Sequence, residues 1–147
     1  MNALIVTCPG CGTKNRIAES RQHQGPRCGR CGEKLDIRRQ ARPVELDDAS
    51  LESFVGSAGL PVVLDFYSPT CGPCQSLAPL LARLAGEYLG RVIIAKIDTS
   101  RNGAGASRYG IRGVPTLVFF RHGKEIDRLV GLPDSATLRA RLESVAV

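Results

Sequence analysis

The chain has 147 residues, 43% of them apolar, and a formal net charge of +6 at neutral pH. Its apolar content is ordinary for a soluble globular protein, and no apolar run approaches the roughly 18 residues that a membrane-spanning helix needs. The first residues lack the long apolar segment of a signal peptide, so we expect a cytoplasmic protein without a membrane partner.

The positive charge lies in the N-terminal part of the chain. Residues 1–42 carry nine Lys/Arg and three Asp/Glu, whereas residues 43–147 carry eleven of each. This asymmetry indicates two units. We place a small unit at residues 1–37, a polar linker at 38–43 and a larger domain at 44–147.

The small unit contains two of the three C-x-x-C pairs. Cys8 and Cys11 form the first pair, and sixteen residues separate it from the second pair, Cys28 and Cys31. A segment this short buries too little apolar surface to fold alone. Two such pairs at this distance are the spacing of a zinc ribbon, because each two-residue gap lets one tight turn offer two thiolates to one ion. We therefore predict one structural Zn²⁺ at these four cysteines, with disulfides or an additional redox pair as the alternatives.

The small unit offers little else in the way of chemistry. Four protein ligands close the zinc shell, so no position remains for a reacting water. His23 lies between the two pairs and is expected to be a surface loop residue. The basic charge allows phosphate contacts, but residues 1–42 hold no Phe, Tyr or Trp on which bases could stack. A solvated basic face is therefore favoured over nucleic-acid binding.

The first half of the larger domain alternates strands and helices. Residues 44–46 favour a short strand, and a helix capped by Asp47 or Asp48 follows. The near-continuous apolar runs at 61–67 and 91–98 are typical of strands that are buried on both faces. Between these two runs, leucines at helical spacing predict a helix over 72–89 that contains Pro79 and ends at Gly90. We expect the proline to kink this helix.

The second half of the domain predicts a hairpin and a final helix. Residues 100–110 are rich in glycine and favour a weak helix or a loop. Residues 115–120 and 125–130 read as two strands joined by a tight turn, and a last helix begins near Asp134. The order predicts an α/β fold with a central mixed sheet: a parallel core, an antiparallel hairpin at its end, and helices on both faces.

The third C-x-x-C pair, Cys71 and Cys74, lies between a buried strand and the longest predicted helix. Cys71 falls at the helix N-terminus, where free backbone N–H groups and the helix dipole stabilise a thiolate and lower the thiol pKa. This position favours Cys71 as a nucleophile. Cys74, one turn further on, is placed to resolve a mixed disulfide formed at Cys71. Pro73 suits the first turn, because its missing N–H costs nothing there.

Two charged residues interrupt the apolar strands. Asp65 lies on the strand that leads to the cysteines, and a buried carboxyl has a raised pKa that suits it to general acid/base work, with Cys74 as the proton partner. Lys96 either pairs with Asp65 or reaches solvent from a strand end. Pro115 begins the first hairpin strand, and its preceding peptide bond is either cis or that of an ordinary strand-start proline.

The larger domain resembles the thioredoxin family. The segments "DFYSPTCGPC", "AKID", "YGIRGVPTLVFF" and "GKE" match it in order and spacing over about residues 43–147. With the "CPGC" and "CGRC" pairs, nearly the whole chain resembles the zinc-containing bacterial thioredoxin 2 type. The resemblance implies a thioredoxin fold after a small zinc ribbon, and a thiol–disulfide oxidoreductase that reduces protein disulfides. It also implies a redox-active Cys71–Cys74 disulfide and an NADPH-dependent flavoprotein thioredoxin reductase as partner.

The resemblance also assigns roles to single residues. It makes Cys71 the attacking and Cys74 the resolving cysteine, Asp65 the buried acid and Lys96 its tuning neighbour. Pro115 becomes the cis-proline of the substrate groove. The surface that contacts substrate comprises Thr70, Gly72, Pro73, Val114 and Gly131. Thr70 and Tyr67 stand where the family usually has Trp, so substrate contact and local packing are expected to differ there.

We expect a monomeric protein-disulfide reductase that exchanges dithiol for disulfide at Cys71 and Cys74, with a structural or redox-sensing zinc site. The alternative from another class is a binding module. In that case the ribbon would dock a protein or nucleic-acid partner, and the larger domain would be its scaffold.

Overall fold

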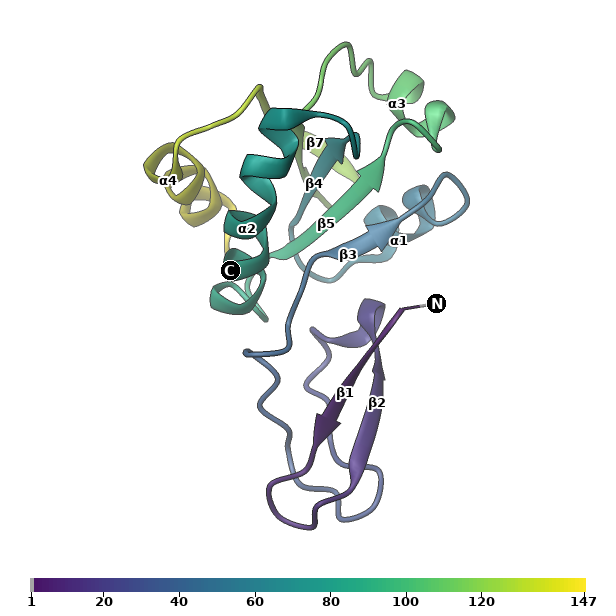
Figure 1. Ribbon diagram of the computed structural model, residues 1–147, viewed down its shortest axis with the longest axis vertical. Coiled ribbons are helices and arrows are strands. Elements are labelled where there is room, and N and C mark those ends of the chain that lie inside the picture. Colours follow the sequence, from purple (N-terminus) through teal and green to yellow (C-terminus); the bar gives the residue numbers. More distant parts are fainter. Residues whose placement is uncertain (1) are drawn as a thin grey trace.

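The computed structural model describes residues 2–147. It consists of an N-terminal hairpin unit and a five-stranded sheet with helices, which lie end to end (Figure 1). We call residues 2–37 the ribbon. In it, β1 (Ala3–Thr7) pairs antiparallel with β2 (Lys14–Ala18), and the short 3-10 helix η1 (Glu19–Arg21) follows. Within residues 2–147 no helix is long and apolar enough to cross a membrane.

The larger part follows the predicted order of strands and helices. Its elements are β3 (Val44–Leu46), α1 (Leu51–Ser57), β4 (Val62–Tyr67), α2 (Gly72–Glu87), β5 (Ile93–Asp98), α3 (Gly103–Arg108), β6 (Thr116–Arg121), β7 (Lys124–Val130) and α4 (Ser135–Val145). The sheet order is β3-β5-β4-β6-β7. β3, β5 and β4 are parallel, while β6 and β7 run antiparallel to them. The predicted parallel core with an antiparallel hairpin at its end is therefore confirmed.

Each face of the sheet buries its own apolar core. On one face, alternate strand residues such as Val63, Ile94 and Phe119 pack under α2 and α4. On the other face, residues such as Leu64, Ile97 and Phe120 pack against α1 and the segment after α3. Because β4 and β5 lie inside the sheet and are covered on both faces, they need the continuous apolar runs that the sequence shows.

The ribbon has a small core that ends against the sheet domain. Leu4, Val6 and Ile17 pack with buried Cys8 and Cys28, and Leu89, just after α2, packs against this cluster. The hairpin itself was not part of the sequence prediction. Its strands alternate buried and exposed side chains over five residues only, which is a weak pattern beside two cysteine turns.

The segment 38–43 makes more contacts than a free linker would. The backbone of Arg38 packs closely against α2 at Gly86: a Cβ added at Gly86 would lie 2.5 Å from the Arg38 carbonyl oxygen, so only a glycine leaves room for this contact. Arg42 pairs with the buried carboxylate of Glu19 at 3.0 Å. The Gln22 side chain donates to the Arg42 carbonyl at 2.7 Å. These contacts tie the ribbon to the sheet domain.

Three local details differ from the sequence prediction. The N-cap of α1 is Ser50, not Asp47 or Asp48, and its side chain makes no capping bond. Asp48 instead accepts hydrogen bonds from the first backbone N–H groups of α3. His23 lies in a loop but is half-buried, because its Nδ1 accepts a hydrogen bond of 3.3 Å from the Gly90 N–H across the junction with the sheet domain.

Candidate functional site

Cys71 and Cys74 form a disulfide at the N-terminus of α2. Cys71 is the N-cap residue, and its Sγ accepts a hydrogen bond of 3.2 Å from the Cys74 N–H. Cys71 is half-buried, whereas Cys74 is 5% exposed. Pro73 falls in the first turn, as predicted from its missing N–H. The more accessible sulfur therefore belongs to Cys71, and the free N–H groups of the helix end stabilise negative charge there.

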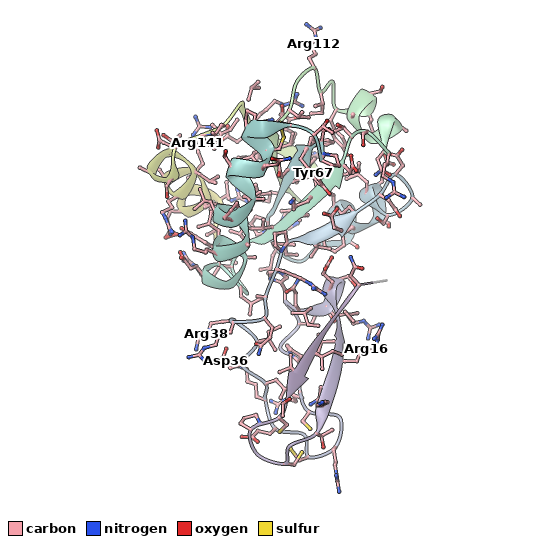
Figure 2. The ribbon with its side chains drawn as sticks, in the orientation of Figure 1. Arg16, Asp36, Arg38, Tyr67, Arg112 and Arg141 are labelled. Carbon is pink, nitrogen blue, oxygen red and sulfur yellow. A yellow bond between two sulfur atoms is a disulfide. The ribbon has the colours of Figure 1, made fainter. Side chains whose placement is uncertain are left out.

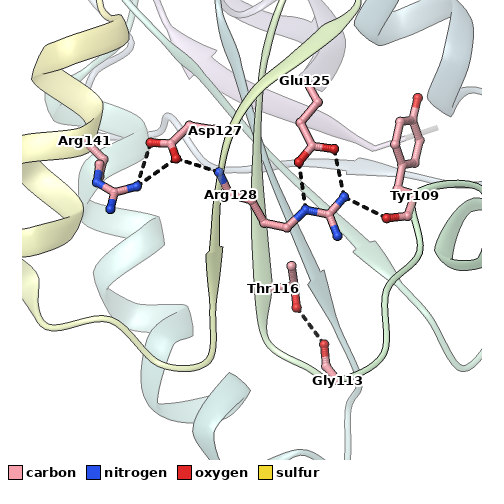
Figure 3. A network of polar contacts seen from close by, with 7 residues as sticks. All are labelled: Tyr109, Gly113, Thr116, Glu125, Asp127, Arg128 and Arg141. Atoms are coloured by element: carbon pink, nitrogen blue, oxygen red, sulfur yellow. Dashed lines mark hydrogen bonds and ion pairs between the residues drawn. The ribbon is translucent and has the colours of Figure 1, made fainter.

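A loop before β6 faces this disulfide. The Val114–Pro115 peptide bond is cis, and the Cys71 Sγ lies 3.6 Å from the Val114 carbonyl oxygen. The Thr116 hydroxyl donates a hydrogen bond of 2.7 Å to the Gly113 carbonyl and closes the loop (Figure 3). Gly131, with a φ of 87°, donates its N–H to the Pro115 carbonyl at 2.9 Å. The loop and the end of β7 thus form one wall beside the sulfurs.

Side chains of β7 brace this wall from outside (Figure 3). Arg128 binds the Glu125 carboxylate and donates at 2.7 Å to the Tyr109 carbonyl, at the end of α3. Arg141 from α4 binds the Asp127 carboxylate at 2.7 Å. The Arg128–Tyr109 hydrogen bond joins β7 to the end of α3, and the Arg141–Asp127 ion pair joins it to α4, whereas the Arg128–Glu125 pair lies within β7. Each of these half-exposed ion pairs contributes little on its own.

The rim of the wall is apolar and exposed. Val130 is 76% and Leu132 52% exposed, on either side of Gly131. Thr70 is exposed at the tip of the loop before α2, where its hydroxyl lies 3.2 Å from that of Ser68. An apolar surface of this kind next to a reactive group suits contact with another polypeptide.

Asp65 is buried on the face of β4 that lies under α2, at 1% exposure. Neither of its carboxylate oxygens has a hydrogen-bond partner among residues 2–147. Burial raises the pKa of this carboxyl to about 7; the positive charge of Lys96 opposes the shift and the negative charge of Glu45 adds to it. A carboxyl that titrates near neutral pH can accept and return a proton under ordinary conditions.

Lys96 lies beside Asp65 in the sheet without forming an ion pair with it. The two residues are directly opposite each other in the β4–β5 ladder. The Lys96 Nζ, however, lies over the Tyr67 ring at 4.4 Å from its centroid. The Tyr67 hydroxyl donates a hydrogen bond of 2.8 Å to the Glu45 carboxylate. Sequence reasoning missed Glu45, because only the strand order places this short edge strand next to β5.

The four ribbon cysteines form a second sulfur cluster. Their Sγ atoms all lie within 4.8 Å of one another, and the Cys8–Cys31 and Cys11–Cys28 pairs are each 3.6 Å apart. Thiolates arranged tetrahedrally around zinc at about 2.3 Å have sulfurs about 3.8 Å apart. The side chains that are present therefore fit a four-thiolate metal site.

The two cysteine turns have the same backbone geometry. Cys8 and Cys28 each accept a hydrogen bond of 2.9 Å from the glycine four residues later, with φ values of 78° for Gly12 and 77° for Gly32. Only a glycine adopts such a φ without strain. The four thiols differ in pKa: backbone N–H groups of Cys31 and Arg30 point at the Cys28 sulfur and lower its pKa to about 6, whereas hydrogen bonding to Cys8 raises the pKa of Cys31 to about 12. Cys28 is thus the more ready of these two to supply the thiolate that a metal requires.

The two sulfur sites are at opposite ends of the molecule. The β1–β2 turn lies at the end of the ribbon that points away from the sheet, whereas the N-terminus of α2 lies at the far end of the sheet domain (Figure 1). Figure 2 shows sulfur atoms at both ends and Tyr67 near the upper one. The ribbon therefore leaves the approach to Cys71 open.

Two protein-family models match the chain. One, described as "Thioredoxin", covers residues 42–144, and the other, described as "Thioredoxin 2, N-terminal", covers residues 7–33. Thioredoxin C-3 from Corynebacterium nephridii is 34% identical over 128 residues, which span 87% of this chain and 86% of the relative. A thioredoxin from Synechocystis is 40% identical over 67% of this chain and 92% of its own length.

A solved structure is also similar. A mutant thioredoxin from Halobacterium salinarum superposes with a TM-score of 0.66 and is 38% identical. The match covers 72% of this chain and 92% of the other. Because the second family model covers the segment that holds the four ribbon cysteines, the comparisons account for both sulfur sites.

Proposed function

The chain belongs to the thioredoxin family, and from that premise we propose which of its residues perform the exchange between thiols and disulfides. It is a protein-disulfide reductase with a C-x-x-C active site and an N-terminal four-cysteine ribbon. The observation that carries the assignment is the Cys71–Cys74 disulfide at the start of α2, with one sulfur accessible and the other buried.

The proposed reaction starts from the reduced dithiol. The Cys71 thiolate attacks one sulfur of a substrate disulfide, and the other substrate sulfur leaves as a thiolate that takes up a proton. Cys74 then loses its proton and attacks the Cys71 sulfur of the mixed disulfide. This step releases the second substrate thiolate and forms the Cys71–Cys74 disulfide. Two electrons pass from the dithiol to the substrate, whose disulfide is reduced to two thiols.

Asp65 is the proposed acceptor of the Cys74 proton. Cys74 occupies a buried position of α2 over the sheet face that carries Asp65, so both groups share one water-poor compartment. A thiol in such a place ionises poorly without a base. The raised pKa of Asp65 brings its proton affinity into the range in which transfer from a thiol is feasible. Lys96 tunes this acid.

Substrate polypeptide is proposed to bind along the wall beside Cys71. Thr70, Gly72 and Pro73 form the near side, and Val114, Pro115 and Gly131 form the far side. The exposed backbone of this wall can pair with an extended segment of substrate. Thr70 adds only a small polar side chain, so we propose that the neighbouring apolar rim supplies most of the contact area.

The ribbon is proposed to hold one structural Zn²⁺ through Cys8, Cys11, Cys28 and Cys31. The ion would fix the two cysteine turns and so hold together a unit that has only a small apolar core. We further propose a cytoplasmic, monomeric protein with two kinds of partner: disulfide-bearing proteins, and an NADPH-dependent flavoprotein reductase that returns Cys71–Cys74 to the dithiol.

The test compares the reduction of insulin disulfides by the intact chain and by two cysteine variants, with dithiothreitol as the electron source. We expect Cys71→Ser to abolish catalysis, because no other described cysteine stands at a helix N-terminus in the sheet domain. Cys11→Ser, the control, should lower the zinc content below one per chain and leave most of the activity. Full activity in Cys71→Ser would overturn the assignment.

A further inference from the structure

Three ionisable side chains stand in one row across the face of the sheet that carries α2: Asp65 is buried, Lys96 is half-buried, and Glu45 is exposed on the edge strand. Glu45 of β3 is opposite Lys96 of β5, and Lys96 is opposite Asp65 of β4. Residues that are opposite each other in a ladder point to the same face, so all three side chains lie on the α2 side. The buried positions of α2 carry Cys74 and apolar side chains (Leu77, Leu81, Leu84 and Ala85). Charge in this compartment therefore comes from the strands.

Lys96, in the middle of the row, is flanked by the carboxylates of Glu45 and Asp65 and forms an ion pair with neither. Its Nζ lies within 4.0 Å of no carboxylate oxygen in residues 2–147 and stands instead over the Tyr67 ring. The ring is held in place because its hydroxyl donates to Glu45. Lys96 and Tyr67 are both half-buried, and a fixed ring offers the ammonium group a cation–π contact. Asp65 is left with both oxygens unpartnered.

Glu45 itself is held by the ribbon. β3 is an edge strand of three residues, and within residues 2–147 its only ladder partner is β5. On its other side the Glu45 N–H donates to the Glu19 carboxylate at 2.6 Å, and Glu19 is 6% exposed and paired with Arg42. A short edge strand gains a fixed position from such a bond. Hydrogen bonds therefore connect Glu19 of the ribbon to Glu45, and Glu45 to Tyr67 beside Lys96.

We propose that Glu45 is a positioning residue of the redox centre, which fixes the Tyr67 ring over Lys96 and so leaves the Asp65 carboxyl without a counter-ion. Its own negative charge acts in the same direction, because it disfavours a second carboxylate on the same face of the sheet, and solvent screens part of this effect because Glu45 is exposed. Asp65 then keeps its proton to higher pH than it would beside a free lysine. The effect of Glu45 on the titration of Asp65 is independent of the proposed function, whereas any effect of Glu45 on catalysis rests on the proposed acid/base role of Asp65.

Among residues 2–147, the other charged and titratable groups that face this row also contribute to the balance. They are Glu19 from η1, Tyr67 from β4, Asp98 from β5 and, in the reduced protein, Cys74 from α2. Asp98 is engaged by the N–H and hydroxyl of Ser100 at 2.9 and 2.6 Å. Of the groups in and around the row, Glu45 acts on the Tyr67–Lys96 pair in two ways, through its negative charge near Lys96 and through the hydrogen bond that it accepts from Tyr67.

The experiment follows the carboxyl carbon of Asp65 by ¹³C NMR from pH 4 to pH 10 in the oxidised protein, where Cys71 and Cys74 do not titrate. Loss of one signal in Asp65→Asn assigns it. In Glu45→Gln we expect the midpoint to fall by about one pH unit, the size expected for a unit charge about two strand spacings away at an effective dielectric near 20. Tyr67→Leu, which frees the lysine, should also lower the midpoint.

Two further variants separate charge from folding. Glu45→Asp keeps the charge and should restore most of the shift, whereas a purely structural role would make it as damaging as Glu45→Gln. Glu52→Gln, at an exposed position of α1 where Glu52 pairs with Arg108, changes the net charge equally and should leave the midpoint in place. A midpoint that is unchanged in Glu45→Gln, or equally lowered in Glu52→Gln, overturns the inference.

The pH profile of insulin reduction keeps this result apart from the proposed function. If the Asp65 midpoint falls in Glu45→Gln and the rate profile shifts with it, both proposals are supported. If the midpoint falls and the profile stays in place, Glu45 has its proposed role, and the acid/base role of Asp65 is refuted.

Discussion

Replacing Asp65 by Asn should make the protein more stable, and the size of the effect should depend on pH. The native pKa of Asp65 is raised to about 7 from an ordinary value of 3.8. Below pH 3.8 the carboxyl is protonated in both the folded and the unfolded chain, and burial of the acid then carries no ionisation penalty. As the pH rises, the unfolded chain loses this proton first, so the native state becomes progressively less stable until the pH passes about 7.

The pKa of Asp65 is raised by about three units, and each unit corresponds to roughly 1.4 kcal/mol, so the ionisation penalty on native stability is about 4 kcal/mol at pH values above 7. Asn has nearly the same shape and cannot ionise, so Asp65→Asn should gain this amount at pH 8 and almost nothing at pH 4. In thermal terms the gain is about 8–16 °C for a chain of this size.

The assay is urea unfolding followed by far-UV circular dichroism at pH 4, 6 and 8, with Glu52→Gln as the surface control. A gain in free energy of unfolding that is the same at pH 4 and pH 8 would refute the reasoning, because it would come from packing and not from ionisation. A lower stability of Asp65→Asn than of the unmodified protein at pH 8 would also refute the reasoning, because the predicted sign would then be wrong.

Three other perturbations follow from the packing. Leu84→Ala empties a position in α2 that is 0% exposed and should cost about 2–5 kcal/mol in the free energy of unfolding by urea. Gly86→Ala brings a Cβ against the Arg38 carbonyl, so it should loosen the attachment of the ribbon and speed proteolysis within residues 38–43, even though alanine is the better helix former. An unchanged cleavage rate would show that the contact between Gly86 and Arg38 does not hold the ribbon in place. Burial lowers the pKa of His23 to about 4, so stability should rise with pH from about 4 to 6.5. In acid the Gly90 amide should lose protection against hydrogen exchange, measured relative to its intrinsic exchange rate at the same pH, and His23→Asn should lose this pH dependence.

The sequence predicted those parts of the fold that depend on local pattern. Continuous apolar runs marked β4 and β5, because both strands are buried on two faces. The predicted start of the last helix near Asp134 is confirmed, because Asp134 caps α4 by accepting from the Thr137 N–H. The four ribbon cysteines could be assigned to one site because C-x-x-C spacing reports directly on turn geometry.

The sequence did not predict contacts that depend on strand order. Glu45 appeared as one acid in a three-residue strand, and nothing near it in the chain marked it as a neighbour of Lys96. His23 was expected at the surface because the Gly90 N–H, its partner, is 67 residues away in the chain. The position of the ribbon at the far end of α2 likewise depends on single contacts, such as Leu89 against the ribbon core.

The most direct measurement of the central claim is the identity of the cysteine that bonds to substrate. Cys74→Ser removes the proposed resolving thiol, so a mixed disulfide with a reporter peptide disulfide should accumulate. Peptide mapping by mass spectrometry should place the adduct at Cys71. An adduct found mainly at Cys8, Cys11, Cys28 or Cys31, with Cys71 unmodified, would contradict the account.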